Sequence, residues 1–190
     1  MKIGVLALQG AFAKHISAIR QLGAETHEIR RAEDFANISA LILPGGESTT
    51  MLRLLDSPLS DQIKLHCEKK KPVLATCAGV IILAKEVSSP KQHSFGILDI
   101  HIERNGYGRQ ADSFIASNIK LRGSLFKKAQ DTEGVFIRAP KISSIGDSVE
   151  VIAKHNDTVV AVRQDNLLAT TFHPELSKQS PFHEALLTLC

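Results

Sequence analysis

Short apolar runs alternate with amphipathic stretches through the first half of the chain. Apolar runs over residues 3–8, 40–43 and 73–75 are bounded by Gly or Pro, which is typical of strands buried on both faces of a parallel sheet. Residues 12–22 carry apolar side chains at helical spacing and stop at Gly23, and helical patterns recur over residues 51–55, 63–67 and 78–87. This alternation predicts an α/β fold in three layers, with a mostly parallel central sheet flanked by helices.

The second half of the chain changes to short segments typical of antiparallel strands. We expect strands over residues 96–103, 135–138, 149–155, 159–162 and 167–172. The pairs Asn156-Asp157 and Asp165-Asn166 are turn formers between them, and Pro181 predicts the start of a closing helix. We expect these strands to extend the same sheet and to add a small flanking ribbon. A length of 190 residues indicates one domain over residues 1–190.

Composition and charge narrow the classes of partner. The 23 basic and 20 acidic residues leave a net charge of +3, and with no Trp and one Tyr there are few groups on which bases could stack. We therefore expect no nucleic-acid partner. The first apolar run is too short to cross a bilayer and has no signal-peptide cleavage pattern, so we expect no membrane partner. Three cysteines without CxxC spacing favour a reducing cytoplasm and indicate neither a metal site nor a cofactor.

A cysteine follows one of the predicted buried strands at a strand-to-helix junction. Cys77 comes after the strand over residues 73–75 and lies between the small residues Ala75 and Gly79. This pattern matches the nucleophile elbow of hydrolases, with Cys in place of Ser, and it needs small neighbours because strand and helix nearly touch. The helix N-terminus favours the reactive thiolate. The local pattern leaves a merely buried, structural cysteine as an alternative.

Two further strand ends carry candidate chemistry, because ligands bind at the carboxyl ends of parallel strands. Residues 44–50 read Pro-Gly-Gly-Glu-Ser-Thr-Thr, a loop whose amides can face a developing oxyanion. A plain turn remains open, and a phosphate cradle is disfavoured because the P-loop lysine is missing. His173 follows the last strand with Glu175 two residues later, which supplies a base and a group to orient it. We expect no role for the other seven histidines.

Together these motifs resemble the class I (triad) glutamine amidotransferases, in which a Pro-Gly-Gly loop, a cysteine elbow and a His-x-Glu recur in this order. More narrowly, the chain resembles the glutaminase subunits of pyridoxal 5′-phosphate synthases from residue 1 to about residue 176. The segments that carry the resemblance are residues 4–10, 41–50, 76–79, 104–105, 108–110, 112–114, 134–140 and 172–176.

The resemblance implies hydrolysis of L-glutamine to L-glutamate and ammonia through a γ-glutamyl thioester. It also implies a hetero-complex in which a synthase subunit uses the ammonia to make pyridoxal 5′-phosphate, the vitamin B6 cofactor, and it implies no cofactor for this chain. Cys77 would be the nucleophile, His173 the general base and acid, and Glu175 the residue that orients His173. The oxyanion hole would be formed by the amides of Gly46 and Ala78. Substrate binding would fall to Gly46, Glu47, Ser48, Arg104, Ile137 and Arg138.

Two other functions remain as alternatives to the glutaminase hypothesis. Cysteine-elbow proteins of related α/β architecture include peptidases and carbonyl-detoxifying enzymes, which would not need the Arg104 and Ile137-Arg138 segments. A catalytically silent regulatory or docking subunit would be expected to have a damaged triad, whereas all three positions are filled here.

Overall fold

A computed structural model describes residues 1–107, 113–126, 131–179 and 181–190 of the chain. Residues 108–110 and Asp112, which belong to the segments that carry the family resemblance, lie outside the described residues.

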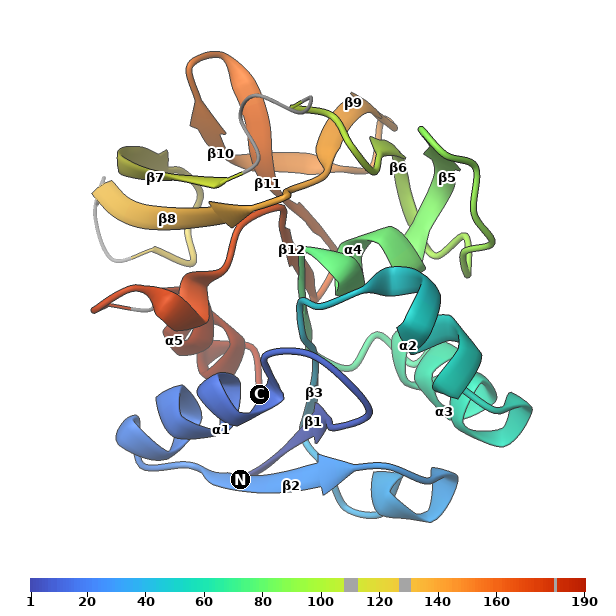
Figure 1. Cartoon of the computed structure of the whole chain (residues 1–190). Coiled ribbons are helices and arrows are strands. Elements are labelled where there is room, and N and C mark those ends of the chain that lie inside the picture. The colour runs from blue at the N-terminus through green and yellow to red at the C-terminus, as the bar shows by residue number, and fades with distance from the viewer. Residues whose placement is uncertain (108–112, 127–130, 180) are drawn as a thin grey trace.

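One large sheet runs through the molecule (Figure 1). Within the described residues it has nine strands in the order β2-β1-β3-β4-β12-β11-β10-β7-β8. The parallel part is formed by β2 (Glu25–Ile29), β1 (Lys2–Leu6), β3 (Ala40–Leu43), β4 (Val73–Thr76) and β12 (Leu167–Thr170). The antiparallel part is formed by β11 (Thr158–Gln164), β10 (Glu150–His155), β7 (Ser113–Leu121) and β8 (Asp131–Ile137). The predicted antiparallel extension of a parallel sheet is thus confirmed.

Helices cover both faces of the parallel part (Figure 1). On one face lie α1 (Phe12–Gln21) and α5 (Pro181–Thr188), and on the other α2 (Ser48–Leu54), α3 (Ser57–Glu68) and α4 (Ala78–Leu83). Successive strand residues point to opposite faces, so Leu74 enters the core with α1 and α5 while Val73 and Ala75 enter the core with the other three helices. This double burial explains the continuous apolar runs and confirms the three-layer prediction.

A second, smaller sheet forms the predicted flanking ribbon. Within the described residues it has three strands, β5 (Ala84–Ser88), β6 (Leu98–Glu103) and β9 (Lys141–Ile145). The helix predicted over residues 78–87 is therefore wrong beyond Leu83. The segment from Ala84 has no strong preference of its own, and pairing with β6 decides its conformation.

The structure also contains elements that the apolar pattern did not predict. Strand β2 has the polar sequence Glu-Thr-His-Glu-Ile and lies at the sheet edge beside β1, where a strand needs few apolar residues. Strands β7 and β9 were likewise missed. Two short 3-10 helices, η1 (Ala32–Phe35) and η2 (Pro174–Leu176), complete the described elements.

The predicted turn and helix ends are confirmed. Gly23 follows α1 with φ +82°, a left-handed conformation that favours glycine. Asn156 and Asp157 both have positive φ between β10 and β11, as a two-residue hairpin turn requires. Pro181 begins α5.

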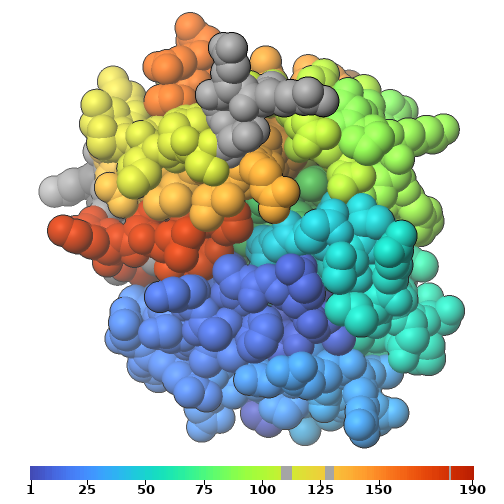
Figure 2. Space-filling model, viewed as in Figure 1, coloured from blue at the N-terminus to red at the C-terminus, as the bar shows by residue number. Residues whose placement is uncertain are grey.

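Strands β1, β3, β4 and β12 are parallel, so their carboxyl ends lie together at one edge of the sheet. The C-terminal segment, red in Figure 2, lies between the blue N-terminal helix and the orange strand on this face of the molecule. In the described part of the chain, no helix is both long enough and apolar enough to cross a membrane.

Candidate active site

Cys77 occupies a sharp junction between β4 and α4. Its backbone has φ 45° and ψ −101°, a conformation that is strained for any residue except glycine. Its N–H donates to the carbonyl oxygen of Thr170 at 2.8 Å, which ties the junction to β12. A Cβ atom at Gly79 would collide with the carbonyl oxygen of Leu43. The predicted elbow is therefore present, and the small residue at position 79 has a direct steric reason.

The second strand end places a histidine and a carboxylate beside the elbow. The N–H of His173 donates to the carbonyl oxygen of Val135 at 2.9 Å, and its ring Nδ1 donates to Glu175 Oε1 at 2.7 Å. The ring and the Cys77 side chain line the same cavity and both lie against Gly45. All three side chains are buried. His173 and Glu175 lie 96 and 98 positions after Cys77 in the sequence. The fold nevertheless brings the three residues together.

The electrostatics of these three residues favour a protonated imidazole. Burial opposes charge on His173, but hydrogen bonds and charge interactions with Cys77 and Glu175 outweigh it and raise the pKa of His173 to about 10. Burial also opposes charge on Glu175, and the neighbouring His15 and His173 nevertheless hold the pKa of the Glu175 carboxyl below its ordinary value. His173 is therefore well suited to accept a proton from a thiol.

Cys67 has a different environment from that of Cys77. Burial and the neighbouring Glu68 raise the pKa of the Cys67 thiol to about 12. A thiol that ionises so reluctantly is a poor nucleophile at neutral pH.

The Pro-Gly-Gly loop packs directly on the triad. A Cβ atom at Gly45 would collide with the His173 ring and would lie 3.2 Å from Cys77 Cβ. The carbonyl oxygen of Gly45 accepts from the N–H of Ala11 at 3.0 Å, which anchors the loop. Ala78 is the first residue of α4, so the helix does not use its N–H.

A cavity of about 240 Å³ opens in front of Cys77 and His173. It collects every residue that the resemblance assigned to substrate binding, namely Gly46, Glu47, Ser48, Arg104, Ile137 and Arg138. Three further residues, Gln9, Ile81 and Asn105, line the cavity and were not predicted from the sequence. Gln9 follows the end of β1, so the rule about strand ends could have found it. Ala78 and Glu175 are buried and are not part of this lining.

One wall of the cavity is a polar network around Glu47. This carboxylate caps α2 by accepting from the N–H groups of Thr49 and Thr50 at 3.1 and 2.7 Å. Burial raises the pKa of the Glu47 carboxyl, but hydrogen bonds from Thr50 and Thr49 outweigh this effect and lower the pKa to about 2. Arg104 Nη2 donates to Glu47 Oε1 at 3.3 Å and to Thr49 Oγ1 at 3.1 Å. Ser48 is buried and donates to Gln92 Oε1 at 2.9 Å.

Another part of the cavity wall comes from the end of β8. Ile137 is partly exposed there, and Arg138 follows it with φ 42°. Positive φ at a residue with a long side chain is a local strain that recurs at binding sites.

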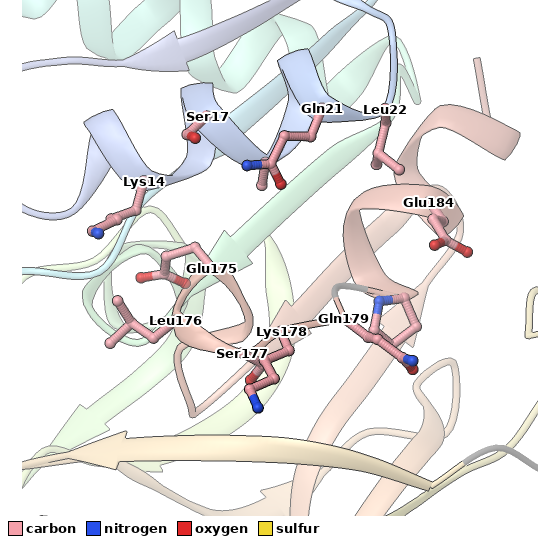
Figure 3. Close-up of a pocket in the computed structure, with 12 residues that line it drawn as sticks. Lys14, Ser17, Gln21, Leu22, Glu175, Leu176, Ser177, Lys178, Gln179 and Glu184 are labelled. Atoms are coloured by element: carbon pink, nitrogen blue, oxygen red, sulfur yellow. The ribbon is translucent and has the colours of Figure 1, made fainter.

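A larger cavity of about 710 Å³ lies on the other side of Glu175 (Figure 3). Side chains of α1, such as Lys14 and Gln21, line one wall, and residues that follow Glu175 line the other. Neither Cys77 nor His173 reaches it, and the Glu175 carboxylate itself is fully buried. The smaller cavity is therefore the one that Cys77 and His173 share. Over the described residues, no cluster of three or more His, Cys, Asp or Glu is arranged to hold a metal ion.

Comparison with known proteins agrees with this geometry. Residues 5–189 match the SNO glutamine amidotransferase family. A protein of Dehalococcoides mccartyi strain 195 named pyridoxal 5′-phosphate synthase subunit PdxT is 50% identical over 96% of this chain and 94% of its own length. A protein of the same name from Oenococcus oeni is 47% identical over 97% and 94%. A crystal structure described as a glutamine amidotransferase superposes with a TM-score of 0.90 at 41% identity, covering 98% of this chain and 97% of that one.

Proposed function

The chain belongs to the SNO glutamine amidotransferase family, and we propose that it is the glutaminase subunit of a pyridoxal 5′-phosphate synthase. It hydrolyses L-glutamine to L-glutamate and ammonia, and the ammonia is used by a synthase subunit in vitamin B6 biosynthesis. The observation that carries the proposal is that Cys77 and a His173 ring hydrogen-bonded to Glu175 share the edge of a cavity that also holds Arg104.

The reaction has two halves with the same catalytic groups. His173 accepts the Cys77 proton, and the sulfur attacks the side-chain amide carbon of glutamine. The negative oxygen of the intermediate is stabilised by the amides of Gly46 and Ala78. Protonated His173 then gives its proton to the departing nitrogen, so ammonia leaves and a γ-glutamyl thioester remains. Water, deprotonated by His173, attacks the thioester and releases glutamate and the free thiol. Glu175 keeps the His173 ring in the productive tautomer throughout.

The cavity fits a single amino acid better than a peptide. Its volume of about 240 Å³ lies below the roughly 300–1,000 Å³ of pockets that enclose larger ligands. Arg104 supplies a guanidinium suited to hold the α-carboxylate of glutamine, while Glu47, Ser48, Ile137 and Arg138 contribute to the walls. These features favour a glutaminase over the cysteine-elbow peptidases.

Ammonia must be sheltered, since water would protonate it or carry it away. We therefore expect this chain to work in a hetero-complex with the synthase subunit and to have low activity alone, because docking completes the oxyanion hole by reorienting a peptide of the Pro-Gly-Gly loop. Residues 1–190 act as one amidotransferase domain. The three cysteines are unpaired, which suits a cytoplasmic location.

The decisive experiment combines the purified chain, glutamine and the synthase subunit, and follows glutamate, ammonia and pyridoxal 5′-phosphate together. We expect stoichiometric glutamate and ammonia, cofactor formation only in the complete mixture, and no turnover with Cys77→Ala. Cys67→Ala is the matched control and should keep the full rate, because the Cys67 thiol resists ionisation. Full glutaminase activity of Cys77→Ala would refute the triad. Equal rates with and without the synthase would refute only the activation by docking.

A further inference from the structure

Two histidines without an assigned role lie buried behind the triad. His15 belongs to α1 and His183 to α5, and neither side chain is exposed. Nδ1 of His15 lies 2.8 Å from Nε2 of His183. Two imidazoles at this distance share one proton between the facing nitrogens, so one donates and the other accepts. The helices that cover one face of the sheet are thus joined by a polar contact inside an otherwise apolar core.

The other nitrogen of His15 faces the catalytic carboxylate. Nε2 of His15 lies 3.4 Å from Glu175 Oε2 and 3.3 Å from Thr76 Oγ1. The first contact is close but is not aligned as a hydrogen bond, and Glu175 Oε2 is a buried atom with no hydrogen-bond partner in the described structure. A buried carboxylate oxygen without a hydrogen-bond partner is unfavourable unless a nearby polar group stabilises its charge. The His15 ring edge supplies a basic nitrogen to it.

The charge state of the ring determines which tautomer His15 adopts. Burial lowers the pKa of His15, an effect that the Glu175 carboxylate only partly opposes, so the ring is neutral and carries one proton. A neutral ring with its Nε2 lone pair toward Glu175 would repel the carboxylate. The proton therefore lies on Nε2 and Nδ1 accepts, which makes His183 the donor through its own Nε2. His183 fixes the tautomer of His15 just as Glu175 fixes that of His173.

We propose that His15 is a positioning residue of the glutaminase reaction, whose Nε2–H edge holds Glu175 in the orientation that keeps His173 aligned on Cys77. His15 lies outside the substrate cavity and acts only through Glu175. This inference rests on the proposed glutaminase function, and it extends the triad by one polar layer between α1 and α5.

Two substitutions, His15→Asn and His15→Gln, distinguish the roles of the two ring nitrogens of His15. The amide oxygen of Asn can replace Nδ1 as the acceptor of the contact with His183, whereas the amide nitrogen of Gln reaches the place of Nε2 and faces Glu175. In the complex with the synthase subunit, His15→Asn should lower kcat about 10- to 100-fold, the range typical when the group that orients a metal-binding histidine is removed, with KM for glutamine unchanged. His15→Gln should keep most of the wild-type kcat. A role in folding alone would make kcat follow Tm in both variants instead.

A double-mutant cycle tests whether His15 acts through Glu175. In a Glu175→Ala background, His15→Asn should change kcat by less than about twofold, because no carboxylate remains to be oriented. Equal losses in the two backgrounds would overturn the proposal, as would a wild-type kcat for His15→Asn. If His15→Asn fails to fold, His15→Gln takes its place in the cycle. An equal fold-loss of kcat on His15→Gln in the wild-type and Glu175→Ala backgrounds would then overturn the proposal.

The chain offers a matched control in His66, a buried histidine of α3 whose Nε2 contacts the carbonyl oxygen of Pro72 at 3.2 Å. His66→Asn removes a buried imidazole far from the triad and should leave kcat unchanged even if Tm falls. Failure of the proposed function is distinguishable, because the wild-type complex would then release no glutamate and no ammonia. An active wild type with an insensitive His15 refutes the positioning role alone.

Discussion

Nδ1 of His173 donates to Oε1 of Glu175 at 2.7 Å, and only one residue separates the two along the chain. His173 caps the 3-10 helix η2, which begins at Pro174 and contains Glu175, and this tight turn brings both side chains to the same side. The contact is buried, so water does not compete with it. A short-range contact therefore fixes the orientation of the His173 ring.

Glu175→Gln should remove most of the activity. The neutral amide no longer stabilises imidazolium and can hold the His173 ring in the wrong tautomer, so we expect kcat to fall by on the order of 10²- to 10⁴-fold. Steady-state glutamate release by the complex measures it. Glu184→Gln is the control, since this exposed residue of α5 contacts no member of the triad. A Glu175→Gln variant within threefold of wild type would show that the contact has no catalytic role.

Gly45→Ala should impair the reaction by displacement rather than by loss of a functional group. The new methyl would collide with the His173 ring and crowd Cys77, and misplacing reacting groups by about 1 Å can cost on the order of a hundredfold in rate. Labelling of Cys77 by a reactive glutamine analogue should slow in parallel with kcat. Unchanged labelling would mean that the loop yields freely and does not position the base.

Arg104→Gln should weaken glutamine binding. The guanidinium lines the cavity and already bonds Glu47 and Thr49, so it is held in place for a carboxylate. Losing one charge-assisted bond of about 1.5–3 kcal/mol corresponds to a KM increase of roughly 10- to 100-fold. Arg53→Gln, on the exposed side of α2, is the control. An unaltered KM would place the α-carboxylate elsewhere in the cavity.

The buried histidine His66 should make the fold sensitive to acid. Burial lowers the pKa of His66 to about 4, whereas an unfolded chain would protonate it near 6.5. Below pH 6.5 the unfolded state therefore binds more protons, and the stability contributed by the neutral ring is lost as the pH falls toward 4. Thermal unfolding between pH 7 and 4 should show a smaller decline in Tm for His66→Leu than for wild type. Parallel curves for the two proteins would contradict this.

Much of the site was predictable because its parts are local. An elbow at Cys77, a glycine loop at residues 45–46 and a His-x-Glu at residues 173–175 are each recognisable within a few positions, and each follows a strand whose burial leaves a continuous apolar run. Since parallel strands end at one edge of a sheet, these motifs were expected to meet. The helical pattern misled after Leu83, where residues 84–88 form β5 through pairing with β6, the next strand along the chain.

The sequence by itself determined the α/β class and singled out Cys77, His173 and Glu175 as candidates, because strand-end position, spacing and residue chemistry encode them, while the family resemblance added Arg104. Only the tertiary structure decided the partners of His15. A histidine on the buried face of α1, next to Ile16 and four residues before Ile19, has the pattern of an ordinary core residue. Its contacts with Glu175 and His183 span 160 and 168 positions along the chain. The packing of α1 against η2 and α5 creates them, and that packing depends on the whole fold rather than on any local pattern.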